Sequence, residues 1–309
     1  PEQIEKISPR TLKVGAKFGV IVVMCQDVAY EVATFRNDGA YIDGRRPISI
    51  EYTSAKEDIL RRDFTINGIL YDPLEDKIID YVNGLGDIQS KIIKAIGTPL
   101  QRFSEDKLRM LRAVRFTIRL DFTLELETKK AIQQMATDIT QVSQERITDE
   151  MEKIFTGPTP HNALFLLQET GLLPHLLPHF VYYQPKALNT IHAIFSQLEG
   201  CAFDTVLALL LAHVGHTAPL IEFDFQLEDN PKNYENQLKS SQVFNLSNQI
   251  IKNVSQIWVN LTQFKNYRQM RKALKMRILL NPLFAKALTL QRLWEINRQP
   301  TIGITTLLE

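Results

Sequence analysis

The sequence is poor in cysteine and has no long apolar run. Cys25 and Cys201 are the only cysteines in 309 residues, too few and too far apart for a disulfide framework or a zinc site. Such sparing use of thiols is typical of a reducing cytosol, so we expect a cytoplasmic protein. The apolar stretch from Val206 to Val214 is too short to span a bilayer, and we expect no membrane partner.

A dominant charge is also absent. The 36 basic and 35 acidic residues leave a net charge of +1, so any contact with nucleic acid has to come from local clusters of charge. Residues 102–119 and 265–277 are basic clusters, whereas residues 222–229 are acidic. The hydrophobic fraction of 44% suits a globular protein with a sizeable core.

The order of the residue patterns predicts an α+β protein with a small sheet first and helices after it. Residues 13–52 alternate β-branched and aromatic residues with Gly, Asp and Pro, and residues 69–71 and 78–81 are again strand-like. Beyond residue 85 the pattern is overwhelmingly helical. Helices are expected at roughly 124–137, 145–156, 161–170, 186–198, 203–214, 246–260, 267–278 and 283–295.

A further helix is expected to begin at Ser104, with Glu105 and Asp106 in its first turn, because a serine cap and early acids stabilise a helix N-terminus. Apolar residues then recur every three or four positions, which predicts a buried face. These residues are Leu108, Leu111, Val114 and Ile118.

Two polar strings point to nucleotide chemistry. Residues 61–68, RRDFTING, combine two guanidiniums, a carboxylate and a carboxamide. Arg62 can donate to phosphate oxygens while Asp63 accepts from a ribose hydroxyl. The alternative is a charged strand end in which Asp63 caps a turn.

The second string is residues 104–115, in which Asp106 lies one helical turn before Arg109. Cytosine and adenine share an amino group beside an unprotonated ring nitrogen, whereas guanine and uracil present a carbonyl beside an N–H. A carboxylate that accepts from the amino group and a guanidinium that donates to the ring nitrogen would therefore select C and A. The alternative is an ordinary helix ion pair.

Arg112 and Arg115 continue the same three-residue step. Because a helix has about 3.6 residues per turn, each step drifts by about 60° around its axis. Arg115 is therefore expected to point away from Asp106. This geometry favours Arg112 at the nucleotide and leaves Arg115 either there or paired inside the fold.

Both strings resemble the class II tRNA nucleotidyltransferase and poly(A) polymerase family, whose members build or repair the CCA end of tRNA. The resemblance covers most of the chain. It implies a truncated nucleotidyltransferase head of the polymerase-beta type over residues 1–92, a helical neck over residues 93–160 that binds nucleotide and RNA, and a helical body and tail over residues 161–309 that bind tRNA. It also implies that ATP, CTP and the tRNA 3′ end are partners, and it leaves the oligomeric state open.

Residue by residue, the resemblance implies two sets of binding positions. The nucleotide-binding candidates are Arg62, Asp63, Asn67, Asp106, Arg109, Arg112 and Arg115. The loop that resembles the family's flexible loop supplies the RNA-binding candidates Arg36, Arg45 and Arg46. Residues 80–88 are similar to the family's hinge between head and neck, and Glu150 belongs to a neck motif that is mainly structural in the family.

The metal-binding motif of the family has no counterpart in this chain. In the family, a Gly-Gly-x-x-Arg-Asp turn and an Asp-x-Asp pair that binds Mg²⁺ lie upstream of a segment similar to residues 1–4. This chain begins with Pro1 and contains neither motif, so we expect a fragment that is inactive by itself, with no metal site. Glu31 is a candidate for a third metal carboxylate, or else a solvated strand residue.

The resemblance implies that the intact parent adds CMP and AMP to the 3′ end of tRNA without a template. Two alternatives stay open within the enzyme class, namely a poly(A) polymerase and an enzyme that adds only A or only CC. A non-catalytic RNA-binding protein is the alternative from another class.

Overall fold

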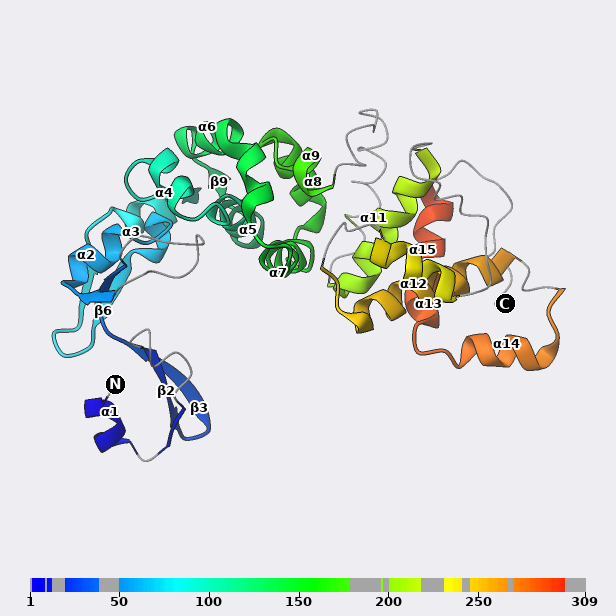
Figure 1. Cartoon of the computed structure of the whole chain (residues 1–309), viewed down its shortest axis with the longest axis horizontal. Coiled ribbons are helices and arrows are strands. Elements are labelled where there is room, and N and C mark those ends of the chain that lie inside the picture. The colour runs from blue at the N-terminus through cyan, green and yellow to red at the C-terminus, as the bar shows by residue number, and fades with distance from the viewer. Residues whose placement is uncertain are drawn as a thin grey trace. The chain divides into compact units, whose positions relative to one another are not determined.

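The structure is a computed structural model that describes residues 2–8, 10–12, 20–38, 50–177, 196, 200–217, 231–240, 245–265 and 269–297. The chain divides into two compact units, Pro1–Asp106 and Lys107–Glu309. Strands gather in the N-terminal part of the chain and helices fill the rest (Figure 1), which confirms the predicted order. The domain limits expected after residues 92 and 160 stay predictions.

The first unit begins with helix α1 (Glu2–Ile7) and a three-stranded antiparallel sheet. Gln26 and Asp27, both with positive φ, form the two-residue turn between its second and third strands, because that backbone twist suits a tight hairpin. The sheet has the order β1 (Thr11–Leu12), β2 (Val20–Cys25), β3 (Val28–Ala33).

Two further hairpins and several short helices complete this unit. Strand β4 (Arg36–Asp38) pairs with β5 (Ile50–Tyr52), and β6 (Ile69–Asp72) pairs with β7 (Lys77–Asp80), both antiparallel. The remaining elements are α2 (Ala55–Leu60), the 3₁₀ helix η2 (Thr65–Asn67), α3 (Gly84–Gln89), β8 (Ile92–Ile93) and α4 (Pro99–Glu105).

Asp80 fixes the connection between β7 and α3. Its carboxylate accepts hydrogen bonds from the backbone N–H groups of Val82, Gly84 and Leu85 at 3.0, 3.0 and 2.9 Å. Gly84 allows a close approach here, since a Cβ at this position would lie 2.2 Å from the carbonyl oxygen of Thr65. The stretch similar to a hinge is thus a tightly bonded turn.

The second unit is built around helix α5 (Arg109–Leu120), which packs against α7 and α8. The four predicted apolar residues of the 108–118 stripe are all buried, as the periodicity requires. Around it lie β9 (Thr123–Leu124), α6 (Leu126–Met135), η3 (Ala136–Gln141), α7 (Gln144–Phe155), α8 (Pro160–Glu169) and α9 (Leu173–Leu176).

A second group of helices follows in the same unit. Helix α11 packs against α13 and α15, and Trp258 Nε1 donates to the carbonyl oxygen of Ala208 at 3.0 Å. Buried Asp204 accepts from Lys286 Nζ at 2.7 Å and from Asn253 Nδ2 at 2.8 Å, which ties the three helices together. The elements are α11 (Phe203–Thr217), α12 (Pro231–Ser240), α13 (Asn248–Lys265), α14 (Lys272–Leu279) and α15 (Phe284–Asn297).

Most of the predicted helices are confirmed, with ends that differ by a few residues. The helix expected at 186–198 lies outside the described residues except for Ser196. The helices that were not predicted include the short ones α1, α2, α3, α4 and α9, since short runs carry little periodicity. Helix α12 was not predicted because residues 231–240 are mostly polar. Within the described ranges, no helix is long and apolar enough to cross a bilayer.

We expect Asp80→Ala to lower the free energy of unfolding by about 1 kcal/mol, because backbone N–H groups at the start of α3 lose their acceptor. Burial raises the pKa of Asp80, but its backbone hydrogen bonds outweigh burial and lower it from 3.8. The carboxylate therefore stabilises the fold above pH 3.8, and its contribution fades as pH falls through the lowered pKa.

Denaturant unfolding of wild type and Asp80→Ala between pH 7 and pH 2 measures this difference, which should shrink below about pH 4. Glu75→Ala, at an exposed position in the preceding turn, is the control and should leave stability nearly unchanged. A difference in the free energy of unfolding between wild type and Asp80→Ala that stays constant down to pH 2 would contradict stabilisation of this turn by the Asp80 carboxylate.

Candidate functional site

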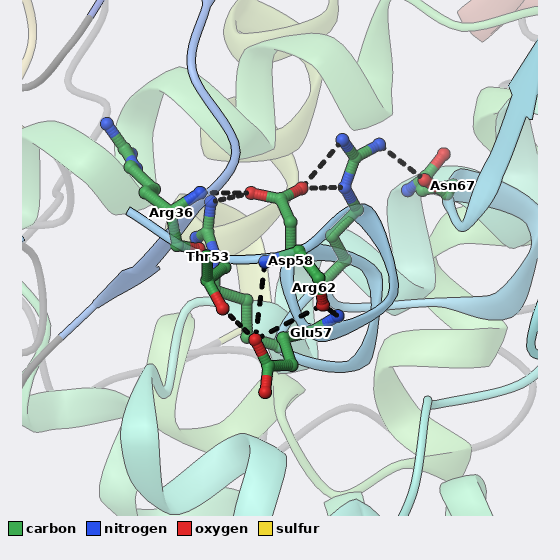
Figure 2. A network of polar contacts seen from close by, with 8 residues as sticks. Arg36, Thr53, Glu57, Asp58, Arg62 and Asn67 are labelled. Atoms are coloured by element: carbon green, nitrogen blue, oxygen red, sulfur yellow. Dashed lines mark hydrogen bonds and ion pairs between the residues drawn. The ribbon is translucent and has the colours of Figure 1, made fainter. Parts of the chain in front are cut away.

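Arg62 is held in one orientation by two neighbouring groups. Its Nε and Nη2 donate to Asp58 Oδ2 at 3.1 and 2.9 Å, and its Nη1 donates to the carbonyl oxygen of Asn67 at 2.9 Å (Figure 2). These bonds use one N–H of each guanidinium nitrogen, so each terminal nitrogen keeps a second N–H outside them. The Arg62 side chain is 36% exposed. A partly exposed pair of parallel donors suits a phosphate or another anion.

Asp58 is the buried centre of this network, with 3% of its surface exposed. Besides Arg62, its carboxylate accepts from Arg61 Nη2 at 2.7 Å and from the backbone N–H of Arg36 at 3.2 Å. Burial raises the pKa of Asp58, but the hydrogen bonds from Arg61, Arg36 and Arg62 outweigh burial and lower it. Asp58 therefore stays ionised at neutral pH.

Asp63 lies beside Arg62 and is also buried. Its Oδ1 accepts from the backbone N–H of Phe64 and from Asn67 Nδ2, both at 2.9 Å. Asn67 thus supports both candidates, because its carbonyl oxygen binds Arg62 while its carboxamide binds Asp63. Asp63 also orders the turn into η2, and nucleotide binding by Asp63 and Asn67 stays a prediction.

The two polar strings, residues 61–68 and 104–115, do not include Asp58, although the sequence contains a pattern that predicts its contact with Arg62. Ser54 and Glu57 form a capping box at the start of α2, the Ser-x-x-Glu pattern that marks a helix N-terminus. On a helix that starts there, Asp58 and Arg62 are four residues apart, the spacing at which side chains meet. The pattern predicts both the helix and its ion pair.

The helix expected to begin at Ser104 is a wrong prediction. Helix α4 starts at Pro99 and ends at Glu105, and Asp106 follows it in an extended conformation. Ser104 Oγ donates to the carbonyl oxygen of Gln101 at 2.8 Å, so it closes a helix and does not open one. Proline at the first position of α4 favours this earlier start.

Asp106 and Arg109 therefore do not lie on one helix, because Asp106 follows α4 in an extended conformation and Arg109 is the first residue of α5. Asp106 closes the first unit and Arg109 belongs to the second. Arg109 is buried, with 9% of its surface exposed. Base selection by these two residues stays a prediction.

Arg112 and Arg115 have different surroundings on α5. The Arg112 guanidinium lies 5.5 Å from the ring centre of half-buried Phe116. Arg115 Nε donates to Glu150 Oε2 of α7 at 2.6 Å, with 9% and 4% of the two side chains exposed. Arg115 is thus paired inside the fold, which was one of the two possibilities left for it. The pair also agrees with a structural role for Glu150.

The RNA-binding candidates are described only in part. The backbone of Arg36 joins β4 to α2, since its N–H binds Asp58 and its carbonyl oxygen accepts from Arg61 Nε. In Figure 2 the Arg36 side chain extends away from Asp58. Arg45 and Arg46 lie outside the described residues.

Glu31 is a solvent-exposed residue of β3, opposite Val22 of β2. No group of three or more His, Cys, Asp or Glu side chains in the described part of the chain is arranged to hold a metal ion. The described residues therefore offer no set of ligands that Glu31 could complete.

We expect Arg115→Ala to lower the free energy of unfolding by about 1–3 kcal/mol, because Glu150 would lose its buried partner and keep exposed Lys153, whose Nζ lies 3.1 Å from its Oε1. Arg119→Ala, at an exposed position of the same helix, should cost at most about 0.5 kcal/mol. Replacing both partners, as in Arg115→Met with Glu150→Met, should recover part of the loss. Urea denaturation measures all three, and equal stability of Arg115→Ala and Arg119→Ala would refute a structural role.

Two segments of the chain match known protein families. Residues 1–94 match the family described as "Poly A polymerase head domain". Residues 121–183 match the one described as "Probable RNA and SrmB- binding site of polymerase A". The first match contains the whole Asp58 network, and the second begins just after α5.

Individual relatives agree with these matches. The chain is 47% identical over 177 residues to a CCA-adding enzyme of Geobacillus thermodenitrificans, covering 57% of this chain and 44% of the relative. It is 40% identical over 216 residues to a CCA-adding enzyme of Bacillus subtilis, covering 70% of this chain and 53% of the relative. The chain thus spans about half the length of these relatives.

A solved structure extends the similarity over nearly the whole chain. The CCA-adding enzyme of Bacillus stearothermophilus, in complex with CTP, aligns with a TM-score of 0.74 and 32% identity, covering 96% of this chain and 66% of that one. Head and RNA-binding segments thus occur here in the same order and fold. The chain belongs to the tRNA nucleotidyltransferase and poly(A) polymerase family.

Proposed function

We propose that this chain carries the nucleotide- and RNA-binding part of a protein that adds CMP and AMP to the 3′ end of tRNA. The observation that carries the proposal is Arg62, held by Asp58 and Asn67 with donors to spare, beside the carboxylate of Asp63. This donor and acceptor pair lies inside the segment that matches a polymerase head domain.

The chemistry of these side chains suits a nucleoside triphosphate. Asp58 is shared between Arg61 and Arg62, and the partly exposed Arg62 keeps N–H groups outside its bonds to Asp58 and Asn67 that can donate to an anionic ligand. Asp63 adds a carboxylate next to Arg62, and a carboxylate is the kind of group that accepts from a ribose hydroxyl. The relatives named as CCA-adding enzymes, one of them solved with CTP, support C and A as the nucleotides.

Magnesium is proposed for the full-length protein only. Two-metal catalysis activates the attacking hydroxyl and stabilises the leaving pyrophosphate. Since the described residues form no cluster that fits a metal ion, no step through Mg²⁺ is assigned to them. That residues 1–309 transfer no nucleotides by themselves stays a prediction.

One assay tests the proposed function and separates its alternatives. A tRNA that lacks its 3′ CCA is incubated with Mg²⁺ and CTP alone, ATP alone, or both, using the product of the complete gene and residues 1–309 in parallel. Addition of CCA and no more from both nucleotides supports the proposal. Long A tracts indicate a poly(A) polymerase, the description that the head-domain match carries, and products that stop after CC or a single A indicate a partial activity.

We expect Arg109→Ala in the full-length protein to relax selection for C and A over U and G by about fivefold to more than a hundredfold. The reason is that the base ring nitrogen loses its donor in a desolvated pocket, which costs about 1–3 kcal/mol. Because Arg109 is buried, the ratio of incorporation rates for the four nucleotides is the readout, and thermal unfolding is recorded beside it. Unchanged preference would remove Arg109 from base selection.

We further expect residues 1–309 to bind tRNA weakly and with strong salt dependence, because basic side chains contact phosphates. The exposed basic residues of α14 and its N-cap, Arg271, Lys272 and Arg277, are candidates for such contacts. Replacing all three by Gln should reduce the slope of log K against log salt by about one per lost contact. Affinity that is the same at low and high salt would contradict this origin of binding.

A further inference from the structure

We propose that Asp58 is a positioning residue of the nucleotide site, which sets the orientation of Arg62 and ties it to the base of the β4–β5 hairpin. The role rests on the nucleotide site proposed above. Asp58 does not touch the ligand in this scheme and acts through Arg62.

The two oxygens of the Asp58 carboxylate accept hydrogen bonds from different groups (Figure 2). Among the described residues, Oδ2 accepts hydrogen bonds from Arg62 alone, through Nε and Nη2 at 3.1 and 2.9 Å. Oδ1 accepts hydrogen bonds from Arg61 Nη2 at 2.7 Å and from the backbone N–H of Arg36, the first residue of β4, at 3.2 Å. Because a carboxylate is planar and rigid, a shift of the hairpin base turns the oxygen that holds Arg62.

Asp58 is also needed to keep the guanidinium plane fixed. An arginine side chain has many rotamers, and ordering it on ligand binding costs affinity. Arg62 avoids that cost because Asp58 and the carbonyl oxygen of Asn67 hold it from two sides. The remaining N–H groups of its terminal nitrogens therefore point in a preset direction.

The variant Asp58→Asn separates charge from position. Its carboxamide keeps one oxygen but turns an NH₂ group toward either Arg62 or the Arg36 and Arg61 donors, which displaces one side of the network. The local positive charge rises at the same time, which by itself favours an anion. Since Arg62 is partly exposed, salt screens that gain, whereas a misdirected donor pair is lost at any salt concentration.

Calorimetric titration of residues 1–309 with CTP at 0.15 M salt tests the role in a double-mutant cycle. Asp58→Asn and Arg62→Met should each weaken CTP binding by about tenfold or more. The double variant should bind no more weakly than Arg62→Met alone, since Asp58 has no effect once Arg62 is gone. Asp58→Glu, which keeps the charge but moves the carboxylate outward, should also weaken binding and serves if Asp58→Asn does not fold.

Glu57→Gln is the matched control, one residue earlier on α2. Glu57 accepts from Ser54 and Thr53 and its variant should bind CTP as wild type does, even if the fold loses some stability. Equal CTP affinity of wild type and Asp58→Asn overturns the role of Asp58, and a further loss in the double variant overturns its action through Arg62. No CTP binding by the wild type overturns the nucleotide site itself, and this role with it.

Discussion

The interior of both units depends on one constraint, which is that a charged side chain leaves water only where an opposite charge or hydrogen-bond donors replace the water. Asp58 meets Arg61 and Arg62, Glu150 meets Arg115, and Asp204 meets Lys286. Each of these carboxylates is less than 10% exposed. Four positive side chains, Arg61, Arg62, Arg115 and Lys286, are thus placed by buried acids.

A contact between a buried acid and an arginine can hold two helices together or orient a group that binds a ligand. Arg115 and Glu150 are both buried, so their pair joins α5 to α7 and offers a ligand little access. Asp58 is shared between two arginines, and the more exposed of them, Arg62, keeps donors outside the pair. Exposure and the ratio of cations to anions therefore distinguish a structural pair from a binding group, and residue type alone does not.

This difference explains how much of the site could be predicted from the sequence. The strands around 20–33 and the buried stripe of α5 follow from local periodicity, which a single sequence displays. The partner of Arg115 is 35 residues away, so only the fold brings it close. The prediction for Asp106 was wrong because a serine followed by two acids is typical of a helix start, whereas α4 begins earlier, at Pro99, and ends at these residues.

A net charge of +1 over the whole chain is compatible with nucleic-acid chemistry, because buried acids pair with part of the positive side chains. Acids that hold arginines in place also cancel their charge in the total, although they leave donors pointing outward. In the cluster of Asp58, Arg61 and Arg62, the whole-chain count hides a guanidinium whose terminal N–H groups are held in a fixed direction. Recognition of phosphate in such a protein depends on which donors the buried acids leave unused, so it is set by geometry more than by overall charge.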